Sequence, residues 1–356
     1  MKEWTLKSEE RAILTLRQLY RQYGYMPYKM SRFEEYDLYV RNKDFLVSDQ
    51  IITFSGSQGK LLALKPDVTL SIVKNAPDTP GVVQKVYYNE NVYRDYREIM
   101  QAGLECVGDL SDYDIAEVAL LAARSLQLLG ENYVLELSHM GLIGAVLDST
   151  YLDEDRKNQA MEFLRRKNAH QLKQLCQNEE DWKKLEQLCT CHGSAEDVLV
   201  RVDAVLTTPQ EKEALQQLRS LYRILREWGC GEAIRIDFSV GSDLRYYSGV
   251  VFRGYLEGIP TGILSGGQYD RLPKKMGRKA RAIGFAIYVD LLQRLWQEQD
   301  GASVDTLILH DGSVDADTLT RAAQEASRQG SVLVCTTIPQ GRSWKNLVQF
   351  KEGKQL

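Results

Sequence analysis

The sequence predicts an α+β protein in which a helical segment divides one sheet domain into two parts of the chain. Two blocks of strand-like sequence, at about 82–107 and 233–264, have alternating apolar residues. The region between them, about 147–227, is charged, rich in Gln and Leu, and has apolar residues at helical spacing. These patterns predict a core made of residues 1–146 and 228–300, with 147–227 inserted as helices.

Helices are expected near both ends of this core. An amphipathic helix starts at Ser8, has acidic residues in its first turn and stops at Gly24. A second helix follows the first strand block, from Asp114 to about Leu129. After the second strand block we expect a Gly-rich turn at Gly266–Gly267 and then a helix near 287–297.

Residues 301–356 form a small unit of their own in this prediction. Val304–Leu309 has the composition of a strand, Asp315–Gln329 that of a helix, and Val332–Cys335 that of another strand. A strand, a helix and a strand in this order predict a small βαβ-like C-terminal α/β unit. The sequence of this tail indicates no function.

Length and composition exclude several classes of protein. The 356 residues, 44% hydrophobic and 26% charged, predict a globular chain of two or three domains. The formal charge of -4 argues against a broad nucleic-acid surface, which normally has an excess of Lys and Arg. The first residues have no apolar signal segment, and no apolar run has membrane-spanning length. We therefore expect a cytoplasmic protein that does not enter a membrane.

The six cysteines are spread without a disulfide framework, as expected for reduced thiols in a cytosol. Cys189, Cys191 and His192 have side chains that bind zinc well. A closed zinc site needs a fourth ligand, and no second cluster of Cys or His lies nearby in the sequence. We expect no metal and no cofactor.

The segment Arg97–Gly108 has the alternation of a strand with one polar face. Gln101, Gly103 and Glu105 share that face, because side chains two residues apart in a strand point the same way. An amide and a carboxylate on either side of a glycine suit a small molecule with an ammonium group and a hydrogen-bonding ring. The alternative is an ordinary strand face exposed to solvent.

Five segments, in order along the chain, resemble the signature motifs of histidyl-tRNA synthetases, which are class II aminoacyl-tRNA synthetases. They are Leu64–Thr69, Val92–Arg94 with Arg97–Glu105, Leu244–Phe252, Gly266–Asp270, and Gly284–Leu291, whose Gly284–Ala286 opens the helix of the third class II motif. Each segment alone is weak evidence. Together they cover most of residues 8–292, which makes a chance resemblance implausible.

The resemblance implies a class II antiparallel sheet flanked by helices and a pocket for histidine. Carried over position by position, the pocket residues are Asp67, Thr69, Arg94, Gln101, Glu105, Tyr247 and Tyr269. The carboxylates and Gln101 suit an ammonium or imidazole group, the tyrosines suit the walls around a ring, and Arg94 suits a carboxylate. Without the neighbouring motifs, Tyr246 and Tyr247 would read as a strand with one aromatic residue on each face.

Other positions depart from the synthetase pattern. The catalytic arginine of the family corresponds to Ser242, and the arginine that ends its third motif corresponds to Leu291. Only Asp95–Tyr96 separates Arg94 from Arg97, where the synthetases have a long loop for ATP and tRNA. Leucine and serine cannot form the paired, charged hydrogen bonds of a guanidinium with phosphate. We therefore expect no catalytic residues and no aminoacylation.

With its Lys65–Thr69 variant and its Tyr246–Phe252 segment, the chain is most similar to the regulatory subunits of ATP phosphoribosyltransferase, which have the synthetase fold. That resemblance implies a non-catalytic partner that activates a short catalytic chain in a hetero-octamer and carries feedback inhibition by L-histidine in histidine biosynthesis. It also implies a self-dimer, although Ser31 replaces the proline of the first class II motif; Glu34 is retained. Binding of tRNA is not expected. The alternatives are a divergent histidyl-tRNA synthetase and an amino-acid sensor built on the same fold.

Overall fold

The computed structural model describes residues 8–46, 50–56, 59–240, 246–296, 304–352 and 354–355. The chain divides into two compact units, one of Glu9–Leu292 and one of Gln293–Leu356 with Met1–Ser8. Within the described ranges, no helix has the length and apolar character needed to cross a membrane.

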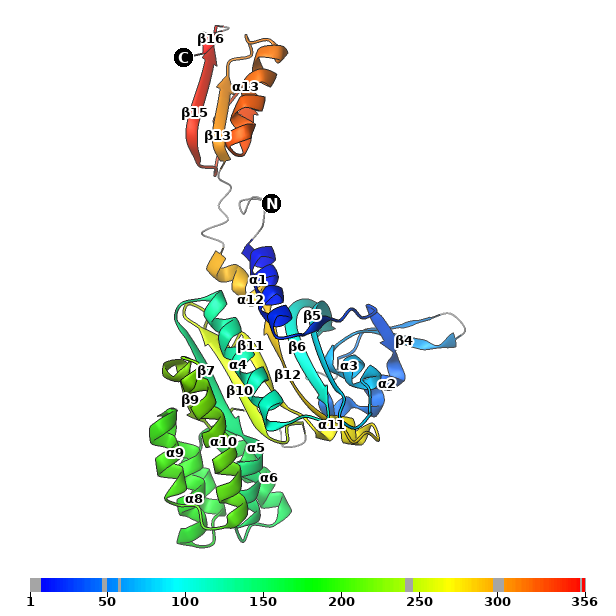
Figure 1. Ribbon diagram of the computed structural model, residues 1–356, viewed down its shortest axis with the longest axis vertical. Coiled ribbons are helices and arrows are strands. Elements are labelled where there is room, and N and C mark those ends of the chain that lie inside the picture. The colour runs from blue at the N-terminus through cyan, green and yellow to red at the C-terminus, as the bar shows by residue number, and fades with distance from the viewer. Residues whose placement is uncertain are drawn as a thin grey trace. The chain divides into compact units, whose positions relative to one another are not determined.

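A nine-stranded sheet forms the centre of the larger unit (Figure 1). Its strands, in spatial order, are β1 (Met26–Pro27), β5 (Val83–Arg94), β6 (Arg97–Gly108), β12 (Arg281–Tyr288), β11 (Leu264–Gln268), β10 (Val250–Leu256), β7 (Tyr133–His139), β9 (Ile234–Asp237) and β8 (His192–Ser194). Most neighbours are antiparallel, as predicted, and only the pairs β1–β5 and β7–β9 are parallel. Strand β12, which was not predicted, joins the two predicted strand blocks, because it pairs with β6 on one side and with β11 on the other.

Helices α1 (Ser8–Gln22) and α4 (Asp112–Leu129) pack against this sheet (Figure 1). Helix α1 is followed by Gly24 with a φ of 81°, a conformation that glycine adopts without strain. The Tyr20 hydroxyl lies 3.0 Å from the Ser125 hydroxyl and so ties α1 to α4. The Tyr20 ring also meets Phe285 of β12 edge-on, with centroids 6.0 Å apart.

Strands β5 and β6 form a long hairpin joined by Asp95 and Tyr96 alone. These residues have φ values of 50° and 59°, which are the two left-handed positions of a type I′ turn. Such a turn matches the right-handed twist of the paired strands, so both can continue in register from Val83↔Gly108 to Arg94↔Arg97. The hairpin therefore ends in a tight turn and has no loop of its own.

Two predictions about glycine segments were wrong. Gly266 and Gly267 lie inside strand β11 and do not form a turn. Gly284–Ala286 lies inside strand β12, and helix α12 (Val289–Trp296) begins only after it. The physical reason is close packing: a Cβ on Gly266 would lie 2.4 Å from the Gly284 carbonyl oxygen of the neighbouring strand. Here glycine allows close approach within a sheet.

The segment between β7 and β9 is helical except for strand β8, which was not predicted and pairs antiparallel with β9 at the edge of the central sheet. It contains α5 (Met140–Asp148), α6 (Glu154–Arg165), α7 (Ala169–Leu175), α8 (Glu179–Thr190), α9 (Ala195–Asp203) and α10 (Pro209–Glu227), followed by the 3₁₀ turn η4 (Gly231–Ala233). The Lys184 ammonium and Glu211 carboxylate, both buried, are 2.9 Å apart and join α8 to α10. Cys189 and Cys191 are buried, and the described part of the chain holds no group of three or more candidate metal ligands.

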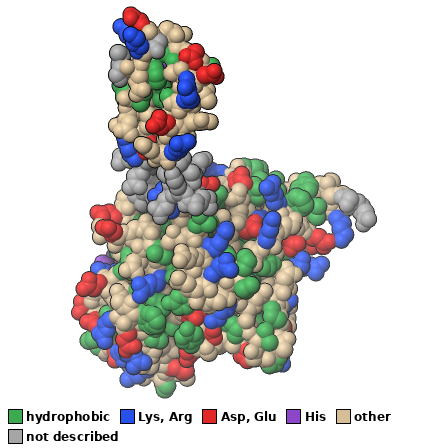
Figure 2. Space-filling model, turned by 45° about the horizontal axis from the view of Figure 1, so that its top comes forward, with side chains coloured by type: hydrophobic (Ala, Val, Ile, Leu, Met, Phe, Trp, Pro, Cys, Tyr) green, Lys and Arg blue, Asp and Glu red, His purple; other side chains and the backbone are tan. Residues whose placement is uncertain are grey.

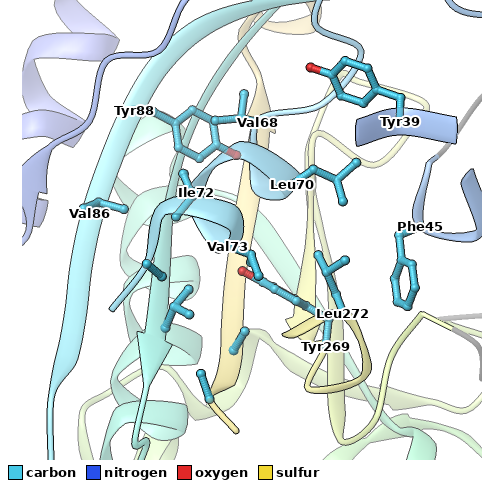
Figure 3. Packing of buried hydrophobic residues seen from close by; sticks show 14 of the residues in the cluster. Tyr39, Phe45, Val68, Leu70, Ile72, Val73, Val86, Tyr88, Tyr269 and Leu272 are labelled. Atoms are coloured by element: carbon cyan, nitrogen blue, oxygen red, sulfur yellow. The ribbon is translucent and has the colours of Figure 1, made fainter. Parts of the chain in front are cut away.

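A smaller three-stranded sheet lies beside the hairpin, in the order β2 (Phe33–Glu35), β4 (Leu61–Leu64) and β3 (Thr53–Ser55). Helix α2 (Tyr36–Arg41), the 3₁₀ turn η2 (Lys43–Phe45) and helix α3 (Thr69–Asn75) accompany it, and α11 (Arg271–Lys275) packs against α3. Figure 3 shows the apolar side chains of α3 between β5 and Leu272. This packing fixes α3 beside the hairpin.

The C-terminal unit has its own four-stranded sheet, in the order β14-β13-β15-β16. Strand β13 (Val304–His310), helix α13 (Ala316–Gln329) and strand β14 (Val332–Cys335) form the predicted βαβ arrangement, with the two strands parallel. Strands β15 (Trp344–Lys351) and β16 (Lys354–Gln355) were not predicted. Strand β15 pairs parallel with β13 and completes the sheet.

Candidate binding site

All seven predicted pocket residues line one cavity of about 330 Å³ in the larger unit. Asp67 and Thr69 come from the start of α3, Arg94 from the end of β5, and Gln101 and Glu105 from β6. Tyr247 precedes β10, and Tyr269 follows β11. The cavity therefore depends on both halves of the sheet.

Strand β6 places Gln101 and Glu105 on the cavity side of the sheet, as its alternation predicted. Both side chains are only 2% exposed, so the alternative of a solvent-exposed strand face was wrong. Strands β5 and β12 pair with β6 on its two sides. Among the described residues, none forms a hydrogen bond with the Gln101 side-chain amide, which is therefore available to a ligand.

Glu105 is held by two hydroxyl groups. The Thr69 hydroxyl donates to its Oε1 at 2.7 Å, and the Tyr269 hydroxyl donates to its Oε2. Burial raises the pKa of Glu105 to about 8, although both hydrogen bonds act in the opposite direction. The nearby Asp67 adds to this rise, because two negative charges in one cavity repel each other.

Asp67 and Arg94 form an opposite-charge pair at another part of the wall. Arg94 Nη2 lies 3.7 Å from Asp67 Oδ2, and Arg94 Nε donates to the Pro66 carbonyl oxygen at 2.6 Å. The Leu70 backbone N–H donates to Asp67 Oδ1 at 2.7 Å. Burial raises the pKa of the Asp67 carboxyl, and Arg94 opposes that shift. The pair thus presents one positive and one negative group to the cavity.

Glycines make room for the polar groups of the site. A Cβ at position 284 would lie 1.7 Å from Glu105 Oε2, so no larger residue fits there with Glu105 in this position. A Cβ at position 103 would lie 2.6 Å from the Tyr88 hydroxyl. The small residues of these strands therefore define the space in which the carboxyl and hydroxyl groups lie.

Three tyrosines form an aromatic wall. The Tyr246 and Tyr247 rings are 4.6 Å apart at 65°, and Tyr246 also lies 5.9 Å from the Tyr269 ring. Neither Tyr246 nor Tyr247 belongs to a strand, since β10 begins only at Val250. The alternative of one aromatic residue on each face of a strand was therefore wrong: irregular backbone lets both rings line the same cavity.

Sequence reasoning missed several wall residues. Tyr88 lies opposite Gly103 across the hairpin, and Tyr288 ends strand β12 with its hydroxyl 3.3 Å from that of Ser265. The pairing of Tyr88 with the glycine of the polar face could have been found by folding the two segments into a hairpin. Phe45, from the short turn η2, had no signal in the sequence.

Two of the three predicted departures from the synthetase pattern lie in described residues. Leu291 lies in α12, and the two-residue turn after Arg94 is confirmed as the hairpin end. Asp290, next to Leu291, accepts the Met100 backbone N–H at 3.1 Å and fastens α12 to β6. Ser242 lies outside the described residues.

Comparison with known proteins identifies the family. A family model described as histidyl-tRNA synthetase matches residues 3–292. The ATP phosphoribosyltransferase regulatory subunit of Clostridium kluyveri is 30% identical over 77% of this chain and 74% of that protein. The subunit of the same name from Alkaliphilus metalliredigens is 27% identical over 86% and 81%. This chain belongs to the histidyl-tRNA synthetase family, among the ATP phosphoribosyltransferase regulatory subunits.

Solved structures confirm the predicted class II fold for this regulatory-subunit chain. A protein described as an ATP phosphoribosyltransferase regulatory subunit/histidyl-tRNA synthetase from Bacillus halodurans has a TM-score of 0.79 at 23% identity, over 99% of this chain and 96% of that one. A chain of an ATP phosphoribosyl transferase complex from Thermotoga maritima has a TM-score of 0.63 at 18% identity, over 79% and 97%. At these identities the likeness shows the fold alone.

Proposed function

We propose that this chain activates a short catalytic ATP phosphoribosyltransferase chain and carries feedback inhibition by L-histidine. Its identity as a regulatory subunit rests on family membership. The observation that carries the histidine proposal is the cavity itself, where seven residues implied by a histidine-binding family meet in one buried place. Its volume of about 330 Å³ suits a small molecule.

The charges of the cavity suit a free amino acid. An α-carboxylate can pair with Arg94 and an α-ammonium with Asp67, so that a zwitterion meets an oppositely charged pair. The side chain then extends toward Glu105, Gln101 and the tyrosines, which offer an acid, an amide and ring faces. An imidazole ring can use all three kinds of group.

Feedback through this pocket requires a physical link to the state of the complex. Histidine can inhibit only by binding the inhibited assembly more tightly than the active one. The pocket spans α3, the β5–β6 hairpin and the residues around β11. A change in how these elements pack would alter the pocket and the surface of the subunit together.

Partners are proposed from the relatives. The Thermotoga maritima protein is described as part of an ATP phosphoribosyl transferase complex, and a catalytic chain is the partner that we propose here. We also propose a self-dimer within a hetero-octamer, in the cytoplasm. Binding of tRNA is not part of the proposal, since basic and acidic side chains are intermixed on the face in Figure 2 and the formal charge is -4.

The direct test mixes the purified chain with a short catalytic subunit. Size-exclusion chromatography reports the complex, and formation of phosphoribosyl-ATP, with and without histidine, reports activation and feedback. We expect Asp67→Asn to raise the histidine concentration for half-inhibition by at least about tenfold, because loss of one partner of a buried charge pair costs about 2–5 kcal/mol. Activation should survive in this variant.

Glu98→Gln is the matched control, since Glu98 is exposed on the same hairpin and does not line the cavity. It should leave both activation and feedback unchanged. Absence of a complex and of activation at micromolar concentrations would favour the amino-acid sensor. Histidine-dependent exchange between ATP and pyrophosphate at about 1 per second, a common enzyme turnover, would instead support the alternative of a divergent histidyl-tRNA synthetase.

A further inference from the structure

The charged groups that line the cavity do not balance in the absence of a ligand. Asp67 faces Arg94, and Asp44 at the rim lies 2.8 Å from the Lys275 ammonium. Glu105 forms no ion pair with any Lys or Arg among the described residues, and its hydrogen-bond partners, Thr69 and Tyr269, are neutral hydroxyls. It is the one acid in the described wall of the cavity without a cation.

Burial makes an unpaired negative charge on Glu105 energetically unfavourable. Glu105 is 2% exposed, and an isolated carboxylate removed from water is strongly destabilised unless it is paired. The titratable groups around it offer no relief, because Arg94 on β5 is paired with Asp67 and the others are that acid and neutral phenols. They are Asp67 before α3, Tyr88 on β5, Tyr269 after β11, Tyr288 on β12, and Tyr246 and Tyr247 before β10. A buried acid in such surroundings takes up a proton.

We propose that Glu105 is a protonated carboxyl group in the empty pocket and transfers its proton to the imidazole ring of bound histidine. The proposal rests on the histidine-binding function proposed above. The O–H bond of Glu105 breaks and an N–H bond forms on the ring nitrogen that lacks a hydrogen. The charge on Glu105 changes from 0 to −1 and that on the ring from 0 to +1, so no proton is exchanged with solvent.

The local geometry favours this transfer. In the neutral acid the proton can reside on Oε2, and this O–H group can donate a hydrogen bond to the Tyr269 hydroxyl oxygen. After transfer, the Thr69 and Tyr269 hydroxyls both donate to the carboxylate, and the imidazolium supplies the cation that the cavity lacks. Because Gly284 has no side chain, Glu105 Oε2 has the space to occupy this position. Bound histidine thus completes the charge pairing of the pocket.

The mechanism makes basicity of the ligand ring the basis of specificity. A ring that cannot accept a proton leaves Glu105 neutral and gains only contact with the tyrosines. Histidine should therefore bind more tightly than 3-(2-thienyl)-L-alanine, a ring of similar size without a basic nitrogen. We expect a difference of at least about tenfold, equivalent to about 1.4 kcal/mol, since only histidine can form a charged pair with Glu105.

Isothermal titration calorimetry of the full chain with L-histidine tests whether Glu105 and the imidazole ring share one proton in the complex, as the transfer requires. At pH 7.2, titrations in buffers with different heats of ionisation give the number of protons released. Because burial raises the pKa of Glu105 to about 8, and imidazole has a pKa of about 6.5, internal transfer predicts release of about zero protons. Binding of neutral histidine to ionised Glu105 would release about one proton and would overturn the proposal.

The pH dependence of histidine affinity provides a second test. With the same two pKa values, internal transfer predicts that affinity changes by no more than about threefold between pH 6 and 8. A neutral ring on an ionised Glu105 would instead gain about 200-fold over that range, and this result would contradict the transfer. If histidine does not bind at any pH, the proposed function itself fails, which is a separate outcome.

Two matched variants separate Glu105 from the rest of the site. Glu105→Gln should reduce the preference for histidine over the thienyl analogue to within about threefold, because an amide has no proton to give. Asp67→Asn should weaken both ligands alike and keep the preference, since Asp67 meets the ammonium group that they share. An unchanged preference in Glu105→Gln would exclude Glu105 as the specificity residue.

Discussion

At the scale of single residues, the site depends on glycines as much as on the polar side chains that line it. Position 284 illustrates this. A Cβ there would lie 1.7 Å from Glu105 Oε2 and 2.6 Å from the Leu104 carbonyl oxygen, which belongs to the neighbouring strand backbone. Strand β6 cannot retreat without breaking its pairing with β12, so the acid would have to leave its position.

Gly284→Ala should therefore weaken histidine binding and lower stability. We expect at least about a tenfold loss of affinity, and a loss of about 1–3 kcal/mol in the free energy of unfolding from overpacking. Calorimetry and urea unfolding measure the two effects. Gly144→Ala is the control: no heavy atom lies within 4 Å of its added Cβ, so affinity should be unchanged and α5 slightly more stable. Full affinity in Gly284→Ala would contradict the assigned position of Glu105.

His139 shows a second effect at this scale. It caps α5 by accepting the Leu142 backbone N–H at Nδ1, 3.1 Å away. Burial lowers the pKa of His139 to about 4, so the folded protein resists its protonation. An unfolded chain binds that proton near pH 6.5, hence this residue reduces stability as the pH falls from about 6.5 to 4.

His139→Asn should remove this dependence and keep the cap, because an Asn oxygen can accept the same N–H. The native chain should lose roughly 3 kcal/mol more than the variant in the free energy of unfolding between pH 7 and 4. Chemical denaturation of both proteins at several pH values gives the difference. Other groups, including Glu105, contribute equally to both proteins and cancel. Parallel curves would show that His139 is accessible to protons in the folded state.

At the scale of elements, the two-residue turn of the β5–β6 hairpin is the clearest departure from the synthetase pattern. Its two-residue turn leaves no loop between Arg94 and Arg97, where a synthetase holds its substrates. The turn has a cost, because Tyr96 has a φ of 59° and an L-residue with a large side chain is strained there. Tyr96 is also 82% exposed and has little packing to compensate.

Tyr96→Gly should raise the free energy of unfolding by roughly 0.5–1 kcal/mol, since glycine adopts a positive φ without strain. Tyr96→Ala is the matched control: it removes the same ring and keeps the strain, so its stability should stay within about 0.5 kcal/mol of the native chain. Histidine affinity should be the same in all three proteins, as the turn does not line the cavity. Equal stability of the two variants would show that the turn is unstrained.

At the scale of the whole molecule, the pocket and the tail belong to different compact units. Every residue that lines the cavity lies between Asp44 and Tyr288, within the unit Glu9–Leu292. The C-terminal unit has its own sheet of four strands and a helix. Histidine binding should therefore not need residues beyond that first unit.

A chain that ends at residue 303 should bind histidine within about twofold of the full-length affinity, because no contact of the cavity is removed. Calorimetry measures the affinity, and near-ultraviolet circular dichroism shows whether the shortened chain is folded. A tenfold loss in a folded, shortened chain would mean that the tail supports the pocket. The same protein, mixed with the catalytic subunit, would show whether the tail contributes to assembly.

The sequence by itself determined the order of elements and the polar face of β6. These features follow from local periodicity. Side chains in a strand alternate between its two faces, so Gln101 and Glu105 share a face wherever the strand packs. It also determined the family, through motifs in a fixed order. It did not determine that Gly266–Gly267 and Gly284–Ala286 are strands, because glycine is common both in turns and where strands approach closely.

Only the tertiary structure decided how the pocket is charged. Glu105 meets Thr69, 36 residues away, and Tyr269, 164 residues away, and no local pattern states that both partners are neutral. The aromatic wall is similar, because irregular backbone lets Tyr246 and Tyr247 line one cavity. The electrostatic free energy of a buried group depends on everything that surrounds it in space. Sequence neighbours supply only a few of those groups, and the fold supplies the rest.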